Sequence, residues 1–209
     1  MNKEVYILSP VRQVTTEQSA VIAQHVQKVK GDGDHVFNPR EDAPQLDPTG
    51  YNIVMTELAA LDQAAKDGGR VDILWNLGGT PSEGSRVDLG MSIALGLEYR
   101  LVKKFNEENP TGPQIAYRII SNEKVSVEKM HTMLENLLQS DGVTIDWDTV
   151  MITEEQEWQR IRLGLALGCL ARNPNLKIRL GELRGEDDPN KKSYPKVIRE
   201  IERRQHGEV

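Results

Sequence analysis

The chain has 209 residues, of which 38% are hydrophobic and 28% are charged, a balance typical of a soluble globular protein. This length suits one domain, or one domain with a sizeable extension, and allows a substantial core to be buried. The net charge is -6 at pH 7 and the pI is about 5.3. This acidic balance argues against nucleic-acid binding as the main function.

Cysteine content and the N-terminal sequence indicate the compartment. A single cysteine, Cys169, excludes an internal disulfide framework, and its apolar helical surroundings favour inert packing. The first residues lead directly into a short strand-like run without the pattern of a signal peptide. No segment has the apolar length of a membrane span. We therefore expect a cytoplasmic protein that has no membrane partner.

Short apolar runs alternate with helical periodicity through the first half of the chain. Strands are predicted over 5–8, 35–37, 71–75 and 99–102, with helices over 16–30, 53–66 and after the loop that follows Trp75. The polar segment 40–50 is rich in Pro and is expected to be a loop, long enough to serve as a lid. Strands and helices at this spacing predict right-handed βαβ units and an α/β fold of the flavodoxin or Rossmann type, with helices on both faces of a parallel sheet.

The second half has a less regular pattern. Residues 106–113 read as a linker, and 114–120 fit either a strand or a helix. Helices are predicted over 125–139, 154–171 and 194–204, and strands over 149–152 and 176–180. We therefore expect an α/β core over residues 1–104 and a C-terminal α/β extension over 105–209 that packs on it.

One segment is echoed within the chain. The sequence RVDLGMSIALG at 86–96 resembles RIRLGLALG at 160–168. Either a βαβ unit is repeated in degenerate form, or two helices meet the same packing demand with small residues. The loops before the two segments differ in chemistry, which favours the second explanation.

The first of these segments follows the most polar strand-to-helix connection in the chain. The run ending at Trp75 passes through small residues into a helix with two carboxylates near its start, Glu83 and Asp88. Such connections place polar groups at the carboxyl edge of a sheet, where open α/β sheets bind ligands. A carboxylate there can act as a nucleophile or stabilise a cation. The alternative is a purely structural helix cap, with Ser85 as N-cap and Asp88 at the third helical position.

Four short motifs, taken in order, carry a family resemblance. They are VYILSP at 5–10, HVFNP at 35–39, VDILWN at 71–76 and GSRVDLGMSIALG at 84–96. In order and spacing they resemble the nucleoside 2-deoxyribosyltransferase superfamily. The resemblance covers roughly the first half of the chain. Tyr6, Ser9 and Pro10 match the family's first strand and turn, and Gly84, Ser85 and Asp88 match its signature, in which the acid is a nucleophilic Glu.

The resemblance implies an enzyme that cleaves or exchanges the N-glycosidic bond of a nucleoside or nucleotide, as a hydrolase or a transferase. Asp88 would attack the anomeric carbon as the base departs, and a second base or water would resolve the glycosyl ester. A nearby carboxylate suits this reaction because its transition state resembles an oxocarbenium ion. Tyr6 would orient the nucleophile through its hydroxyl. The family resemblance also implies a homo-oligomer.

A second register offers another carboxylate. The string GTPSE at 79–83 matches a GTxxE pattern that occurs in this superfamily and in the phosphoribohydrolases of the lysine-decarboxylase-like group. Glu83 would then be the working acid on a longer loop. The helix register counted back from 94–96 favours Asp88, and Glu83 stays as the alternative.

Several polar residues nearby are candidates for substrate binding. Arg12 and Arg86 are placed to hold a 5′-phosphate, helped by the Ser9 and Ser85 hydroxyls and a helix N-terminus. Asn76 at the tip of the third strand suits a sugar hydroxyl. Each also has a structural reading, because surface arginines are usually solvated and an Asn at a strand end often completes a turn.

The sequence gives little support for a metal site or for a bound nucleotide cofactor. The four histidines, His25, His35, His131 and His206, lack metal-ligand spacing. Neither a Walker loop nor a G-x-G-x-x-G fingerprint is present, so we expect no metal and no cofactor. The rival hypothesis is a non-catalytic nucleotide-binding or sensing protein on the same fold. It is motivated by the replacement of the family's Glu with Asp88, by Ser82 at the position where the family signature has an acidic residue, and by the long C-terminal half.

Overall fold

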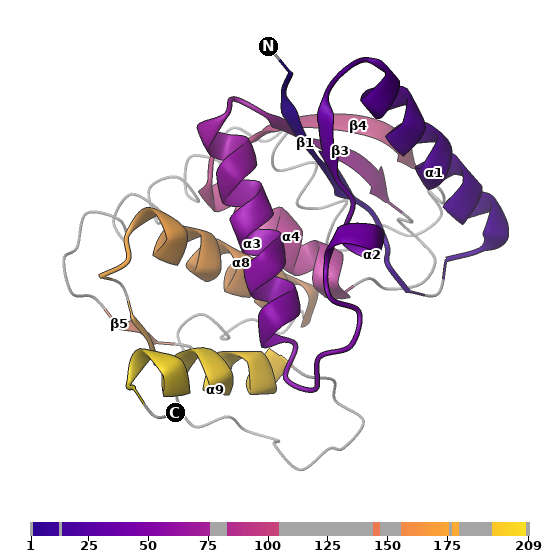
Figure 1. Ribbon diagram of the computed structural model, residues 1–209. Helices are drawn as coiled ribbons and strands as arrows, with labels where there is room; N and C mark the ends of the chain where they lie inside the picture. Colours follow the sequence, from indigo (N-terminus) through magenta and orange to yellow (C-terminus); the bar gives the residue numbers. More distant parts are fainter. Residues whose placement is uncertain are drawn as a thin grey trace.

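The computed structural model describes residues 2–12, 14–75, 83–104, 144–146, 156–175, 177–179 and 194–207 (Figure 1). Its main sheet has four parallel strands in the order β2-β1-β3-β4, with helices packed on it. This arrangement confirms the α/β fold predicted from the alternation of strands and helices. None of the described helices combines the length and apolar character that a bilayer crossing needs.

The strands lie within two residues of their predicted bounds. They are β1 (Glu4–Leu8), β2 (His35–Phe37), β3 (Arg70–Trp75) and β4 (Glu98–Lys104). The first strand lies in the middle of the sheet, where Val5 aligns with Val36 of β2 and Tyr6 with Val71 of β3. Strand β4 pairs with β3 in parallel, with a register shift after Ile73. All four strands therefore end at one carboxyl edge, which begins at Ser9 for β1.

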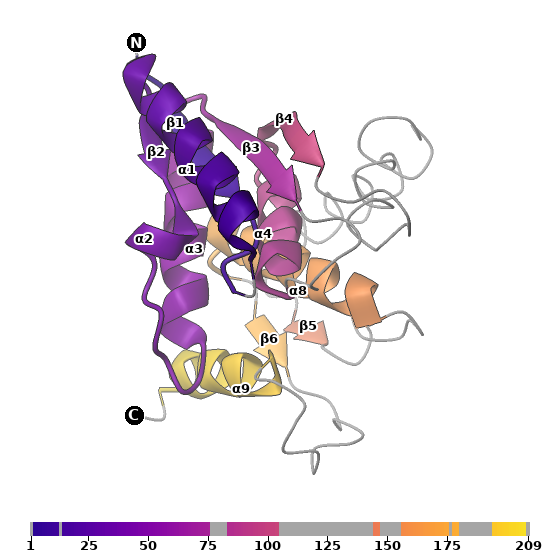
Figure 2. The same ribbon diagram turned by 90° about the vertical axis from the view of Figure 1, so that its right-hand side faces the viewer.

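Helices cover both faces of this sheet, as the view in Figure 2 makes clear. The helix α1 (Thr16–Gly31) packs on one face, and α3 (Tyr51–Lys66) and α4 (Glu83–Ala94) pack on the other. Side chains of β1 alternate between the two layers, because neighbouring residues of a strand point in opposite directions. Val5 and Ile7 join the α1 layer, whereas Tyr6 and Leu8 join the layer of α3 and α4.

The expected loop over 40–50 is partly wrong. Residues Pro39–Asp42 form the short helix α2, because Asn38 accepts the Arg40 N–H at 3.4 Å and Pro39 occupies the first helical turn. The rest of the segment is tied to the start of α3. Asp47 Oδ2 accepts the Asn52 N–H at 2.6 Å. Its polar residues therefore have a structural use in capping α3.

The described part of the second half adds α8 (Gln156–Arg172), α9 (Tyr194–Gln205) and a small parallel sheet of β5 (Thr144–Asp146) and β6 (Lys177–Arg179). Predicted elements at 154–171, 176–180 and 194–204 correspond to α8, β6 and α9. Strand β5 has no counterpart among the predictions. The expected linker at 106–113, the segments 114–120 and 125–139, and the strand at 149–152 lie outside the described residues.

Both C-terminal helices share the core of the first half. Leu163 and Leu167 of α8 and Ile198 of α9 are buried in one apolar cluster with Tyr6 and Val87. At the start of α3, the guanidinium of Arg204 lies 4.1 Å from the centre of the Tyr51 ring. Figure 1 shows α9 running past this end of α3. The C-terminal helices are thus part of the layer that carries α4.

The echoed segments at 86–96 and 160–168 pack against each other as α4 and α8. A Cβ on Gly164 would lie 1.9 Å from the Val87 carbonyl oxygen, and one on Gly168 would lie 2.6 Å from the Ala94 Cβ. Only glycine permits such close backbone approach. This contact agrees with the view that both segments meet one packing demand, and it fixes α8 against the backbone beside Asp88.

Candidate active site

Three ionisable side chains from three elements meet within the layer of α3 and α4. Tyr6 comes from β1, Glu57 from α3 and Asp88 from α4, and they are 1%, 5% and 2% exposed, respectively. Carboxyl groups are rarely buried to this extent without a cationic partner. A buried acid pair is a common arrangement at sites of acid–base or nucleophilic chemistry.

The helix α4 starts before Ser85, and therefore earlier than the capping hypothesis requires. The helix begins at Glu83, so Ser85 lies in its first turn and is not the N-cap. The Ser85 hydroxyl instead donates to the Ser9 carbonyl oxygen at 2.9 Å. The capping-box hypothesis is therefore wrong. The hydrogen bond joins the first turn of α4 to the end of β1, which brings Asp88 to the same layer as Tyr6.

Glu57 was missed by sequence reasoning. It lies on the buried stripe of α3 with Val54, Leu58 and Leu61, three residues after the first of them and four before the last. A charged residue on a core-facing stripe is the signal that could have identified it. The periodicity gives the face on which Glu57 lies, but it does not reveal that Asp88 is the group opposite.

The two carboxyl groups lie close enough to affect each other's titration, and burial has the largest effect on the pKa of both. Burial raises the pKa of Asp88 to about 7, although hydrogen bonds from Glu57 and Tyr6 act to lower it. Burial, followed by the charge of Asp88, raises the pKa of Glu57 well above its usual range. Burial of both acids therefore favours their protonated forms over the ionised ones.

Tyr6 completes the cluster beside Asp88. Its pKa is raised by burial first and then by the charges of Asp88 and Glu57. The hydroxyl is close enough to influence the Asp88 carboxyl, yet Tyr6 Oη and Asp88 Oδ1 have no hydrogen-bond partner of normal geometry in the described part of the chain. Buried polar atoms are nearly always satisfied. The cluster therefore contains two buried oxygens that lack a hydrogen-bond partner among the described residues.

Some other predicted binding residues gather near this cluster. Ser9 and Pro10 are buried after the end of β1, and Ser85 and Arg86 are buried in the first turn of α4. The Ser9 hydroxyl oxygen lacks a hydrogen-bond partner among the described residues. The Ser85–Ser9 bond therefore puts a buried cation, Arg86, on the turn that adjoins the end of β1.

The structure does not place the remaining predicted site residues in the cluster. Arg12 is exposed, and its Nη2 lies 3.4 Å from the Gln45 carbonyl oxygen in the loop before α3. Gly84 is exposed, and a Cβ on it would meet no atom within 4 Å. Asn76 and the side chain of Glu83 lie outside the described residues. Of the two candidate acids, Asp88 alone can be placed beside Tyr6.

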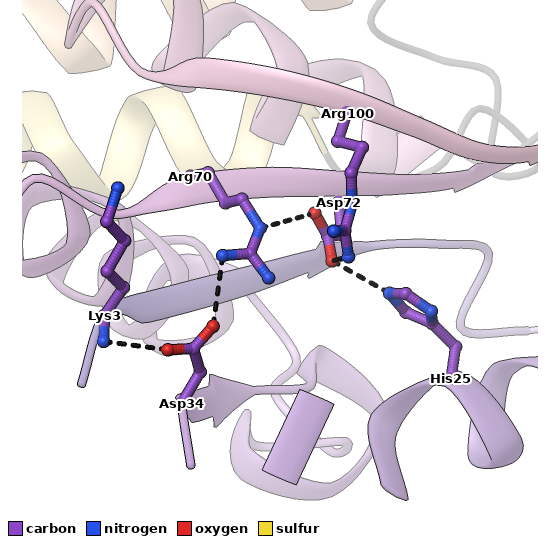
Figure 3. Close-up of polar contacts among 6 residues, drawn as sticks. All are labelled: Lys3, His25, Asp34, Arg70, Asp72 and Arg100. Atoms are coloured by element: carbon purple, nitrogen blue, oxygen red, sulfur yellow. Dashed lines mark hydrogen bonds and ion pairs between the residues drawn. The ribbon is translucent and has the colours of Figure 1, made fainter. Parts of the chain in front are cut away.

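A second buried acid lies on the opposite face of the sheet (Figure 3). Asp72 of β3 is fully buried, and three donors surround its carboxylate. His25 Nε2 of α1 lies 2.8 Å from Oδ2, Arg70 Nε donates to Oδ1 at 3.0 Å, and Arg100 Nη2 donates to Oδ2 at 2.6 Å. Arg70 also pairs with Asp34 at 3.1 Å. Negative charge is balanced here by arginine, so this cluster fits a structural role.

Metal and thiol chemistry find no support in the described ranges. They contain no group of three or more His, Cys, Asp or Glu side chains that could hold a metal ion. Burial raises the pKa of the Cys169 thiol to about 11, which keeps it protonated and suits the expected packing role.

No protein-family model, curated protein or solved structure matches this chain. The features that bear on function are the burial of Tyr6, Glu57 and Asp88 in one layer and the motif resemblance of the first half.

Proposed function

We propose that this protein cleaves or exchanges the N-glycosidic bond of a nucleoside or nucleotide, with Asp88 as nucleophile. The observation that carries the proposal is the buried Glu57–Asp88 pair beside Tyr6. The pair supplies both groups that the reaction needs, a carboxylate to capture the anomeric carbon and an acid to protonate the departing base.

The reaction has two steps on these residues. In the first, a carboxylate oxygen of Asp88 bonds to the anomeric carbon while the bond from that carbon to the base nitrogen breaks. Glu57 gives its proton to the base, and its carboxyl becomes ionised. In the second, water or another base attacks the anomeric carbon, releases Asp88 and returns a proton to Glu57. Tyr6 positions the Asp88 carboxyl through its hydroxyl.

Asp88 is one methylene shorter than the Glu that the resemblance leads one to expect. The displacement of an attacking oxygen by about an ångström can reduce the rate on the order of a hundredfold unless the scaffold compensates. The close approach of Gly164 of α8 to the Val87 carbonyl oxygen fixes the α4 backbone next to Asp88.

A non-catalytic nucleotide-binding or sensing role is the second candidate. It is favoured by the nearly complete burial of Asp88 and by its pKa, which burial raises to about 7, since a protonated carboxyl is a poor nucleophile. Tight nucleotide binding in a thermal-shift screen, without base release, would support this candidate over the enzyme.

The enzymatic proposal is tested by chromatographic detection of free base from a panel of ribo- and deoxyribonucleosides and their 5′-monophosphates. We expect Asp88→Ala to lower the rate by about a thousandfold or more, and Glu57→Gln by about a hundredfold. Asp72→Asn is the matched control, because it alters a buried aspartate of the opposite layer, and it should retain the rate.

Glu83→Ala decides between the two candidate nucleophiles. A loss confined to Glu83→Ala would transfer the role to that residue. If Asp88→Ala and Glu83→Ala each leave base release intact across the panel, carboxylate-dependent glycosidic cleavage is wrong for this protein.

A further inference from the structure

Ser85 connects the start of α4 to the end of β1. Its hydroxyl donates to the Ser9 carbonyl oxygen at 2.9 Å, and both residues are buried. The two residues are 76 positions apart in the chain, so the bond joins two separate elements. A hydrogen bond weakens steeply when its distance or angle departs from the preferred range. The Ser85–Ser9 bond therefore limits how the first turn of α4 can lie against β1.

Asp88 lies on the same face of α4 as Ser85. The two residues are three positions apart in the helix, and side chains at that spacing are neighbours on one face. Ser85 contacts the backbone at Ser9, while the Asp88 carboxyl influences the titration of Tyr6, three residues before Ser9. A shift of α4 relative to β1 would therefore move the Asp88 carboxyl relative to the Tyr6 hydroxyl.

Helix α8 fixes the next turn of α4 by direct backbone contact. A Cβ on Gly164 would lie 1.9 Å from the Val87 carbonyl oxygen and 2.8 Å from the Met91 backbone nitrogen. In an α-helix these two groups pair with each other, and Asp88 lies within the turn that they close. A side chain at position 164 would have to displace this turn by about 1 Å or more, because packed interiors leave no free space for it.

We propose that Ser85 is a positioning residue, whose bond to Ser9 sets the Asp88 carboxyl beside Tyr6 while Gly164 fixes the same part of α4 from the side of α8. This inference rests on the proposed function, in which Asp88 attacks the anomeric carbon. It gives Ser85 a role within the protein scaffold in place of the expected contact with a 5′-phosphate. Positioning matters for this reaction because a displacement of about 1 Å can reduce the rate about a hundredfold.

The first experiment measures kcat and KM for base release from matched pairs of nucleosides and their 5′-monophosphates. Ser85→Ala should lower kcat about tenfold on both members of a pair and leave KM within about twofold, since the lost bond acts on the nucleophile and not on substrate binding. Ser85→Thr keeps a hydroxyl and should restore most of kcat. Gly164→Ala should lower kcat about a hundredfold.

Ser92→Ala is the matched control. Ser92 is also a buried serine of α4, but its hydroxyl donates to the Leu89 carbonyl oxygen of the same helix at 2.8 Å and lies 3.1 Å from the Tyr99 hydroxyl of β4. Ser85→Ala and Ser92→Ala should each lower Tm by about 2–4 °C. Only Ser85→Ala should lower kcat, which separates positioning of Asp88 from a general loss of stability.

The second experiment reads the position of Asp88 without any reaction. The Asp88 carboxyl is titrated by carbon-13 NMR, and Asp88→Asn identifies its signal. Burial raises the pKa of Asp88 to about 7, and a displaced α4 would admit water. Ser85→Ala and Gly164→Ala should therefore lower this pKa by about 0.5 or more, whereas Ser92→Ala should leave it unchanged.

Three results would overturn the positioning role of Ser85. The first is a rise in KM for the 5′-monophosphates alone in Ser85→Ala, which would make Ser85 a phosphate-binding residue. The second is an equal loss of kcat in Ser85→Ala and Ser92→Ala. The third is an Asp88 titration that is the same in the native protein, Ser85→Ala and Gly164→Ala.

Failure of the positioning role and failure of the proposed function are distinguishable. Base release by the native protein together with an unchanged kcat in Ser85→Ala would refute the positioning role alone. If the native protein releases no base from any substrate, the enzymatic proposal is refuted, and the Asp88 titration decides whether Ser85 and Gly164 position the carboxyl.

Discussion

Two buried aspartates of this protein are held in opposite ways. Asp72, in the layer of α1, is fully buried among His25, Arg70 and Arg100, each within hydrogen-bond distance of its carboxylate. Asp88, in the layer of α4, is 2% exposed and has another acid, Glu57, as its partner. Breaking a compensated buried ion pair usually destabilises a protein, whereas an uncompensated buried acid itself costs stability. This difference is the reason why we propose a functional role for Asp88 and a structural role for Asp72.

The largest expected change in the free energy of unfolding concerns Asp72, the charge-balanced aspartate. Asp72→Ala should reduce the free energy of unfolding by about 3 kcal/mol, because it leaves buried His25 and the mostly buried Arg70 without their shared carboxylate. Urea denaturation at neutral pH measures this loss. A change below about 1 kcal/mol would mean that the Asp72 cluster contributes little to the fold and that the contrast between the two aspartates is wrong.

The next largest change in the free energy of unfolding concerns Asp88 and has the opposite sign. Asp88→Asn should raise the free energy of unfolding at pH 8 by about 1–2 kcal/mol, since an amide keeps a donor toward Glu57 and needs no ionisation. The pKa of Asp88 is raised to about 7 in the folded state, so folding binds protons and the stability that the group contributes falls as pH rises from about 4 through 7. The gain from Asp88→Asn should therefore shrink toward zero at pH 4.

Chemical denaturation of the native protein and the Asp88→Asn variant at pH 4, 6 and 8 checks this prediction. Parallel pH dependence in the two proteins would contradict it, because the raised pKa of Asp88 would then have no thermodynamic consequence.

The smallest expected change in the free energy of unfolding concerns an exposed ion pair. Asp62 and Lys66 form an i,i+4 ion pair on α3, with 27% and 65% of their side chains exposed. Asp62→Asn should change the free energy of unfolding by less than about 0.5 kcal/mol, since water screens such pairs. Thermal denaturation in low and high salt measures it. A loss comparable to that of Asp72→Ala would show that burial does not separate these acids.

Much of the fold could be predicted from the sequence because its elements are locally encoded. The apolar runs at 5–8 and 71–75 and the periodicity of 16–30 correspond to β1, β3 and α1. The short helix α2 was missed because its four residues are too few to give a periodic signal. Strand β5, with three residues, is too short to give a periodic signal.

The candidate site was predicted only in part. Tyr6 and Asp88 were identified from motifs, and the structure places them in one layer. Glu57 was not identified, because a helical pattern does not encode what a buried face will contact. Ser85 was assigned to a cap, whereas its hydroxyl bonds to the carbonyl of Ser9, 76 residues away in the chain. Long-range pairings of this kind have no local signature.

The sequence by itself determined the parallel α/β architecture and the presence of an acid near the start of α4, since both follow from local periodicity and residue type. Only the tertiary structure decided which acids are charge-balanced. Asp72 and Asp88 are both aspartates set among apolar residues. Arginines of the sheet surround the first and Glu57 of α3 faces the second, so packing between distant segments sets the energy of each charge.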